Sequence, residues 1–404
     1  KQLWTGDWAG IGYPSQSEAD LSLLSMLCFY SKSNEQVRRL FRLSGLGQRD
    51  KAQKNNRYID RTLAMIRGRQ QREDAAAAQA QGNAVQLVER AAPVKLLPIE
   101  TEPQVDWPPG MVGKLAQWFY ALSPRPVREV AIVSALGLVA GVYGRAYNIS
   151  GSGLNLYIVL VARSAVGKEA MHSSISKLSH MMMSAGASAF SEFIDFSDYA
   201  SGPALVKAIS NSKTGSFVNV AGEWGRKLRK MGDDHTEGPM SSLRTVMTNL
   251  YQKSSAGTIV GGIGYSDKEK NIASTNGVAY SMIGETTPDT FYESLTNTMM
   301  QDGFMSRFIV IEYTGLRPEF NTANSVPIPE DLYNILINGA GAVMHCPPGG
   351  FMDVAMSREA QIMLDAFDKH CDQQINATDD ESWRQMWNRA HLKTLKVAAL
   401  LAVT

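Results

Sequence analysis

Asn155-Leu-Tyr-Ile-Val-Leu-Val-Ala-Arg-Ser-Ala-Val-Gly-Lys-Glu169 is the stretch of sequence that decides the fold. An apolar, β-branched run leads into a turn with Gly167 and Lys168, and a polar helical segment follows. This order is typical of the loop G-x-x-x-x-G-K-[ST], whose backbone N–H groups surround phosphates, whose Lys reaches the β and γ oxygens, and whose hydroxyl binds Mg²⁺. The order predicts a nucleotide-phosphate site. The alternative is a plain turn between strand and helix with a solvated lysine.

The loop departs from the pattern at two positions. Ala162 replaces the first Gly, and Glu169 replaces the hydroxyl residue. We nevertheless expect the whole loop to bind ATP through the following residues: Ala162, Arg163, Ser164, Ala165, Val166, Gly167, Lys168 and Glu169.

Composition sets wide limits on this chain. Its 404 residues, 44% of them hydrophobic, are enough for roughly two or three domains. A net charge of +1 means that any nucleic-acid surface is local. The cysteines Cys28, Cys346 and Cys371 have no metal-like spacing and favour a reducing cytosol. No signal peptide and no apolar stretch of bilayer length is visible, so we expect a cytoplasmic protein without a membrane partner.

Periodicity divides the chain into four parts. Residues 1–69 have helical spacing, and residues 70–109 are rich in Ala, Gln and Pro, as a linker is. Residues 110–328 open with a helical collar at 110–150 and then alternate strands with helices, which predicts an α/β domain with a largely parallel sheet. Within the collar, the apolar segment 130–142 is too short to span a bilayer and is expected to be a core helix. Residues 329–404 are helical again, with long helices expected over 358–371 and 382–403. The chain starts at Lys1 and stops within an apolar helix at Thr404, so we expect it to be a piece of a longer protein.

The next apolar strand supplies an acid. Ser216-Phe-Val-Asn-Val-Ala-Gly-Glu223 has the layout of a Walker B strand, with Gly222 at the Asp position and Glu223 retained. Both usual metal supports are therefore altered together. Either Glu169 and Glu223 hold Mg²⁺ between themselves and the nucleotide, or hydrolysis has been lost.

A hairpin is predicted between the acid strand and the strand that begins near Val278. Thr258-Ile-Val-Gly-Gly-Ile-Gly-Tyr-Ser-Asp-Lys-Glu-Lys-Asn-Ile272 has two apolar arms around a polar tip. Its position resembles that of the pore hairpin of superfamily 3 and MCM-type helicases. That resemblance implies that Lys268 and Lys270 at the tip contact DNA phosphates and that Tyr265 stacks on a base. A plain surface hairpin is the alternative.

The first block resembles the small helical domain that follows the polymerase core in phage and plasmid primases. The resemblance rests on Tyr13-Pro-Ser-Gln-Ser-Glu-Ala-Asp20, Phe29, Gln36-Val-Arg-Arg-Leu-Phe-Arg-Leu-Ser-Gly-Leu46 and Arg49-Asp-Lys51. We expect Ser17 to cap the helix that starts at Glu18, and Gly45 to end the next helix. The basic residues of this block contact a primer–template backbone or form a solvated helix face: Arg38, Arg39, Arg42, Arg49, Lys51 and Lys54.

The segment from Pro108 to Thr404 is similar to the AAA+-like ATPases of phage and mobile-element primase-helicases. In that resemblance the strand at 278–288 is the sensor 1 strand with Thr286 as its polar residue, and Ser306-Arg-Phe carries an arginine finger, Arg307, for the neighbouring subunit. Arg307 in a structural ion pair is the alternative. Arg389 resembles a sensor 2 residue near the γ-phosphate, in competition with Arg384 and Lys393.

Together these features predict an ATP- and Mg²⁺-dependent replicative DNA helicase. In the resemblance, Lys168, Glu223, Thr286 and Arg307 act in catalysis. The expected partners are single-stranded DNA or a replication fork, further copies of the chain in a ring, typically a hexamer, and host or phage replication proteins. The competing hypothesis is a scaffold or loader that binds nucleotide without turnover.

Overall fold

A computed structural model gives the architecture. It describes the residue ranges 2–10, 12–31, 33–54, 56–69, 105–232, 238–255, 257–345 and 351–404. The chain divides into two compact units, Lys1–Pro103 and Gln104–Thr404. Most of the predicted linker, residues 70–104, lies outside the described residues.

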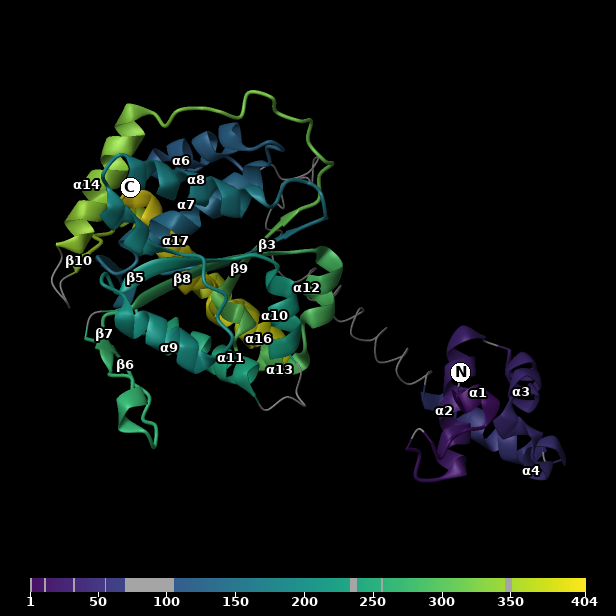
Figure 1. Cartoon of the computed structure of the whole chain (residues 1–404). Helices are drawn as coiled ribbons and strands as arrows, with labels where there is room; N and C mark the ends of the chain where they lie inside the picture. The colour runs from purple at the N-terminus through teal and green to yellow at the C-terminus, as the bar shows by residue number, and fades with distance from the viewer. Residues whose placement is uncertain are drawn as a thin grey trace. The chain divides into compact units, whose positions relative to one another are not determined.

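Helices are the regular elements of the described part of the first unit, and no strand occurs there (Figure 1). Its elements are α1 (Gln2–Thr5), α2 (Gln16–Tyr30), α3 (Asn34–Leu43), the 3-10 turn η1 (Gly45–Gln48), α4 (Asp50–Lys54) and a helix over residues 56–69. They pack around one apolar core, which includes Leu23, Leu24, Val37, Phe41, Leu46, Ile59 and Leu63. The prediction of a small helical module is confirmed.

One predicted helix cap is wrong by two residues. The side chain of Ser15, not Ser17, accepts the hydrogen bond of the Glu18 amide at 3.3 Å, so α2 starts at Gln16. Both serines fit the preference of helix N-caps, and spacing alone did not separate them. The end of α3 falls at Leu43, two residues before Gly45, close to its predicted place.

A five-stranded parallel sheet is the centre of the second unit, as the sequence predicts. Its strands are β3 (Tyr157–Ala162), β4 (Ile194–Asp195), β5 (Ser216–Ala221), β8 (Ala279–Thr286) and β9 (Phe308–Tyr313), in the order β4-β5-β8-β3-β9. The loop strand β3 and the acid strand β5 are thus separated by β8 alone. All five strands run the same way, so their carboxyl ends share one edge of the sheet.

Helices cover both faces of this sheet (Figure 1). One face packs against α6 (Gly110–Leu122), α7 (Arg128–Tyr143), α8 (Ala170–Ser184), η2 (Ser188–Phe193), α14 (Glu330–Met344) and α17 (Ala390–Ala402). The other packs against α9 (Gly202–Asn211), α10 (Trp224–Met231), α11 (Pro239–Leu250), α12 (Pro288–Ser294) and α13 (Asn297–Gln301). Because both faces are covered, β3 and β5 are buried at every residue, which explains their unbroken apolar runs.

The apolar segment 130–142 is a core helix, as predicted. It belongs to α7, in which every residue from Val130 to Tyr143 is buried. Among the described helices, none combines the length and the apolar character needed to cross a bilayer.

The remaining elements lie around this core. They are β1 (Tyr147–Ile149), β2 (Ser152–Gly153), β6 (Ile259–Val260), η3 (Lys268–Lys270), β7 (Thr275–Asn276), η4 (Met305–Arg307), β10 (Met352–Asp353), α15 (Arg358–Asn376) and α16 (Glu381–Asn388). The helix predicted over 382–403 is broken into α16 and α17, because Arg389 takes a non-helical backbone conformation, with φ −116° and ψ 5°. Cys28 and Cys371 are buried free thiols, and Cys346 lies outside the described residues.

Candidate functional site

The phosphate loop connects β3 to α8 in a tightly curled conformation. Ala165 and Gly167 both take positive φ values, 65° and 105°. A side chain at Gly167 is excluded as well by space, since a Cβ there would lie 2.5 Å from the carbonyl oxygen of Arg125. Left-handed residues at alternate positions turn successive backbone N–H groups to the same side, which makes an anion-binding concavity. The loop therefore has the backbone shape that phosphate binding requires, although its first Gly is missing.

Lys168 contacts a carboxylate on the neighbouring strand. Its Nζ lies 3.8 Å from Oε2 of Glu285, and only 17% of the Lys168 side chain and 13% of the Glu285 side chain are exposed. Glu285 precedes the last residue of β8 and pairs in register with Leu160 of β3. Burial raises the pKa of the Glu285 carboxyl, Lys168 lowers it, and Glu169 and Glu223 raise it.

A cavity of about 380 Å³ joins the three strand ends. Its lining includes Ser164, Ala165, Lys168, Glu169, Glu223, Gly225, Arg226, Glu285, Thr286, Thr287 and Thr290. The structure thus brings together six of the predicted site residues, Ser164, Ala165, Lys168, Glu169, Glu223 and Thr286. It adds Glu285, which the sequence analysis did not single out.

The acid strand ends in an unusual backbone conformation at Glu223. This residue has φ 48° and ψ 41°, in the left-handed region, immediately before α10. Such a conformation costs a non-glycine residue about 1–3 kcal/mol and is concentrated at functional sites. The Glu223 side chain is 70% exposed, and its Oε2 lies 3.2 Å from Nε of Arg226. Glu223 therefore lines the cavity from its solvent side.

Thr286 sits on the inner side of the same cavity. It is buried, and a Cβ at Gly225 would lie 2.1 Å from its Oγ1. The absence of a side chain at Gly225 lets the first turn of α10 approach the end of β8. Glu223 and Thr286 are thereby held on adjacent strands, β5 and β8, at one cavity.

A second cavity, of about 410 Å³, adjoins the first and shares Ser164 and Thr287 with it. It is lined further by Arg163, Pro288, Asp289, Glu312, Tyr313 and Thr314. Ala162 lines neither cavity, because it is the buried last residue of β3.

The carboxylates do not form a metal cage by themselves. In the part of the chain that the structure describes, no group of three or more His, Cys, Asp and Glu side chains is arranged to hold a metal ion. Mg²⁺ in nucleotide sites is held by one or two carboxylates together with the phosphates. The carboxylates of this cavity fit such shared binding of Mg²⁺ with phosphates, since Oε2 of Glu285 is buried without a hydrogen-bond partner.

Arg307 lies at the opposite, amino edge of the sheet, directly before β9. The side chain is buried, and it donates hydrogen bonds to the carbonyl oxygens of Thr248, at 3.1 Å, and Gly303. Burial, together with the smaller effect of the Arg389 charge, lowers its pKa to about 10. The structure places Arg307 inside its own chain rather than on a surface that faces a neighbouring subunit. Within the described part of the chain Arg307 forms no ion pair either, since its hydrogen-bond partners are carbonyl oxygens.

Arg389 is also at the amino edge, away from the phosphate loop. In the orientation that satisfies both groups, the amide oxygen of Gln252 accepts hydrogen bonds from Arg389 at 2.7 and 3.0 Å. Its competitors lie elsewhere: Lys393 donates to the carbonyl oxygen of Phe308 at 2.9 Å, and Arg384 donates to that of Ile375. Since none of these cations lines the cavity beside Lys168, the structure does not bring a sensor 2 residue to the loop.

The predicted hairpin exists. Strands β6 and β7 pair antiparallel, and a bridge joins Ile263 to Ile272 nearer the tip. The hairpin ends just before β8 begins, and Figure 1 shows it standing out from the body of the sheet unit. Tyr265 is 40% exposed and Lys268 is exposed, while the side chain of Lys270 lies outside the described atoms.

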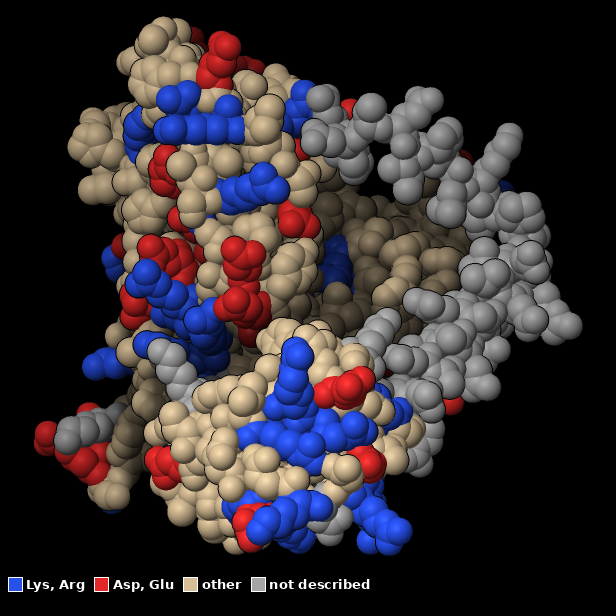
Figure 2. Space-filling view, turned by 90° about the vertical axis from the view of Figure 1, so that its right-hand side faces the viewer, with Lys and Arg blue, Asp and Glu red and all other residues tan. Residues whose placement is uncertain are grey.

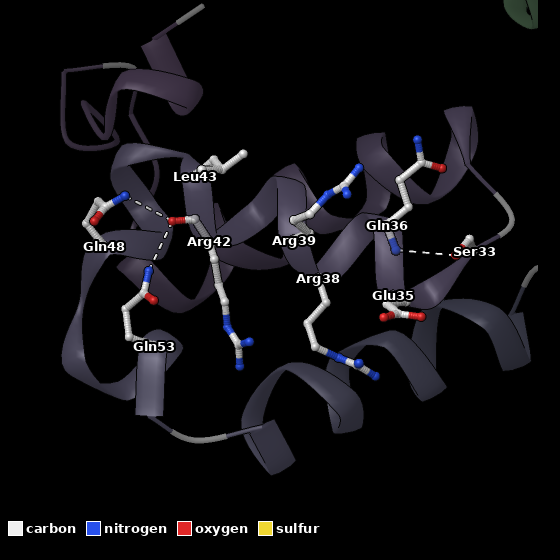
Figure 3. A pocket seen from close by; sticks show the side chains of 9 residues that line it. All are labelled: Ser33, Glu35, Gln36, Arg38, Arg39, Arg42, Leu43, Gln48 and Gln53. Atoms are coloured by element: carbon white, nitrogen blue, oxygen red, sulfur yellow. Dashed lines mark hydrogen bonds between the residues drawn. The ribbon is translucent and has the colours of Figure 1, made fainter.

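A basic surface covers α3 in the first unit. Figure 2 looks onto the side of this unit that carries α3 and α4, and Lys and Arg side chains gather there. A cavity of about 700 Å³ is lined by Ser33, Glu35, Gln36, Arg38, Arg39, Arg42, Leu43, Gln48 and Gln53. Figure 3 shows Arg38 and Arg42 pointing to one side of α3 and Arg39 to the other.

Several members of the basic cluster stabilise the bundle. Arg49 is paired with Asp20, which is 1% exposed and also accepts a hydrogen bond from the Tyr58 hydroxyl at 2.7 Å. Arg38 pairs with Asp60 at 2.8 Å. The ammonium of Lys51 lies 4.2 Å from the Tyr58 ring.

The other three basic residues are different. Lys54 and Asp50 form an exposed pair at 2.8 Å, and Arg42 donates to the carbonyl oxygen of Ala52 at 3.2 Å. Arg39 is exposed and makes no hydrogen bond or ion pair within the described part of this unit. Arg39 is therefore the member of the cluster that is freest to contact a phosphate.

Two features of the structure, one in the cavity and one in the core, escaped the sequence analysis. Glu285 stands in a polar strand end, Gly284-Glu-Thr-Thr, whose acid was passed over in favour of Thr286. Lys396 is fully buried in α17, where its Nζ donates to Oδ1 of Asn155 at 2.7 Å. An acid at the end of an apolar strand was a usable signal for Glu285. The helical spacing of residues 390–402 held no signal for Lys396, because its partner is far away in sequence.

Comparison with known proteins bears on the first unit. No curated protein and no solved structure matches the chain. The family described as the NrS-1 polymerase HBD domain matches residues 16–72. This segment contains most of the motifs that resemble the helical domain behind the polymerase core of phage and plasmid primases. Residues 16–72 are thus similar to the HBD domain of NrS-1 polymerase, which supports a protein of the phage primase-helicase-like kind.

Proposed function

We propose that this chain is the helicase part of a phage or mobile-element primase-helicase, which hydrolyses ATP and moves along single-stranded DNA as a ring of identical subunits. The observation that carries the proposal is the convergence of Lys168, Glu169, Glu223 and Thr286 on one cavity, beside a curled loop at the carboxyl edge of a parallel sheet. Open α/β sheets bind ligands at this edge. The match of residues 16–72 to a polymerase domain supports a role in replication.

The loop backbone and five side chains of the cavity have a part in this proposal. The loop N–H groups and the Lys168 ammonium bind the phosphates. Glu169 and Glu285 provide carboxylate oxygens for Mg²⁺, which when bound supplies charge neutralisation at the phosphates. Glu223 and Thr286 orient a water molecule from the two adjacent strand ends. The adjoining cavity, with Arg163 and Tyr313, has room for the rest of the nucleotide.

DNA contact is assigned to two exposed basic features. In the sheet unit, the hairpin presents Lys268 and Tyr265, which suit a phosphate and a base. In the first unit, the cavity on α3 presents Arg39. A net charge of +1 leaves little diffuse positive surface, so these local features dominate the binding.

A scaffold that binds nucleotide without turnover is the second candidate. The orientation of Glu223 favours it, because this carboxylate is largely exposed and paired with Arg226. In that case the chain loads or anchors a separate helicase.

A phosphate-release assay separates the two candidates. The helicase proposal expects Mg²⁺-dependent release of phosphate from ATP that single-stranded DNA stimulates, and Glu223→Gln should abolish release while nucleotide binding persists. Tight ATP binding with no release, with or without DNA, would favour the scaffold. No ATP binding at all would contradict both candidates.

A further inference from the structure

The carboxylate of Glu285 faces the same ammonium that the proposed function assigns to phosphate. The 3.8 Å between Oε2 of Glu285 and Nζ of Lys168 is too long for a hydrogen bond but short enough for a strong charge interaction. Both side chains are largely buried, so water screens the pair weakly. Lys168 therefore has a counter-ion within its own chain.

Glu285 has little else to stabilise its charge. Its Oε2 is buried and accepts no hydrogen bond. A buried carboxylate that loses its charge partner is strongly destabilised, because desolvation is then uncompensated. Of the cations that line this cavity, Lys168 and Arg226, the second is already 3.2 Å from Glu223.

The other acids of the cavity destabilise the charge of Glu285 further. Glu169 and Glu223 both disfavour the charged form of Glu285. A phosphate that draws Lys168 toward itself brings further negative charge and at the same time takes away the partner of Glu285. Only a cation that arrives with the phosphate restores the balance of charge.

We infer that Glu285 makes phosphate binding conditional on a divalent cation. Its carboxylate competes with phosphate for Lys168, and bound Mg²⁺ relieves that competition. This inference rests on the nucleotide site of the proposed function. This role differs from the water-orienting role of Glu223. It also explains how the chain retains metal dependence although Glu169 and Gly222 replace the usual hydroxyl and Asp.

Equilibrium binding of a fluorescent ATP analogue, in EDTA and in Mg²⁺, tests the inference without any turnover. Glu285→Gln keeps the size of the side chain and removes its charge. We expect this variant to bind the analogue roughly tenfold more tightly than the parent in EDTA, about 1.4 kcal/mol, and the gain from Mg²⁺ to shrink by a similar factor.

Two further variants separate charge from other effects. Glu285→Asp keeps the negative charge and should keep most of the metal dependence of the parent. Glu293→Gln removes an equal charge from the exposed pair that Glu293 forms with Arg229 on α12 and α10, and should leave both affinities unchanged.

The outcomes are distinct. Affinity of Glu285→Gln in EDTA equal to or weaker than that of the parent would overturn the inference while the nucleotide site stands. If the parent binds no analogue in either condition, the proposed function falls and the inference falls with it.

Discussion

Both edges of the parallel sheet carry cationic side chains, but the cation at the carboxyl edge faces a cavity, whereas those at the amino edge are buried in the core. At the carboxyl edge, Lys168 faces a cavity, and its partner is the carboxylate of Glu285, which it can leave for a ligand in that cavity. At the amino edge, Arg307 and Lys396 are buried and bonded to backbone or amide oxygens. Among the described residues, no carboxylate lies within ion-pair distance of these two cations.

This difference distinguishes a cation that can bind a ligand from cations that stabilise the fold. A cation that serves a ligand must be able to leave its resting partner, and Lys168 can do so because the cavity is open beside it. A cation bonded to main-chain oxygens inside a core holds elements together. Arg307 joins η4 to α11, and Lys396 joins α17 to the segment before β3. In sequence, Lys168 and Arg307 were equally good functional candidates.

The largest expected effect is the loss of stability on removal of Arg307. Arg307→Ala leaves the carbonyl oxygens of Thr248 and Gly303 without their donor in a buried place, and it opens a cavity. We expect the free energy of unfolding to fall by about 3 kcal/mol, measured by urea denaturation. The exposed Arg317→Ala is the control, with a change within about 0.5 kcal/mol. Arg307→Ala as stable as the parent would return Arg307 to the list of possible arginine fingers.

Removal of the cation at the other edge should spare the fold and cost binding. Lys168→Ala takes away the side chain that reaches the phosphates, so we expect the affinity for Mg²⁺–ATP to fall by roughly 100-fold, about 2.7 kcal/mol. Isothermal titration calorimetry measures the affinity. Circular dichroism should show a folded protein, with a lower melting temperature because Glu285 loses its charge partner. Lys177→Ala, an exposed lysine of α8, is the matched control. Unchanged affinity in Lys168→Ala would mean that the site lies elsewhere.

Lys396 makes the amino edge sensitive to pH. Burial, together with the smaller effect of the Arg389 charge, lowers the pKa of Lys396 from 10.5 to about 7. Between these values the unfolded chain binds the proton that the folded chain has released, so stability rises with pH, by up to about 1.4 kcal/mol per pH unit. Unfolding free energies at pH 7, 8 and 9 should climb in the parent and climb less in Lys396→Met. Lys393, whose pKa burial lowers to about 8, keeps part of the slope in both proteins. Equal slopes in the two would show that Lys396 stays charged.

The smallest effect is expected at the hairpin, where exposure leaves stability untouched. Each lysine that contacts a phosphate of a single strand adds about 0.7 to the magnitude of the log–log salt slope of binding. Lys268→Ala with Lys270→Ala should therefore lower that magnitude by roughly 1.4, as measured by fluorescence anisotropy over a range of salt concentrations. Binding of ATP should not change. A slope equal to that of the parent would move the DNA contact to Arg39 and its neighbours on α3.

Much of the fold followed from local pattern. The start of β5 was predicted to the residue, and α7 was recognised as a core helix, because a strand or helix buried on all sides is apolar along its whole length. The break at Arg389 was missed, since residues 382–403 keep a helical pattern through it.

The site was predictable only in part. Lys168, Glu223 and Thr286 followed from their places at strand ends, which parallel strands bring to one edge. The pairing of Lys168 with Glu285 and the burial of Arg307 depend on strand order and on contacts across long sequence separations. No periodicity encodes these.

Hydrogen–deuterium exchange with and without Mg²⁺–ATP compares the two edges in one measurement. We predict slower exchange in peptides that cover residues 163–171 and 284–287, where the loop amides and Glu285 lie, and unchanged exchange over residues 303–309 and 388–397. The protection should disappear in Lys168→Ala. No protection of the loop at saturating nucleotide, or protection at the amino edge instead, would contradict the assignment of the phosphate site.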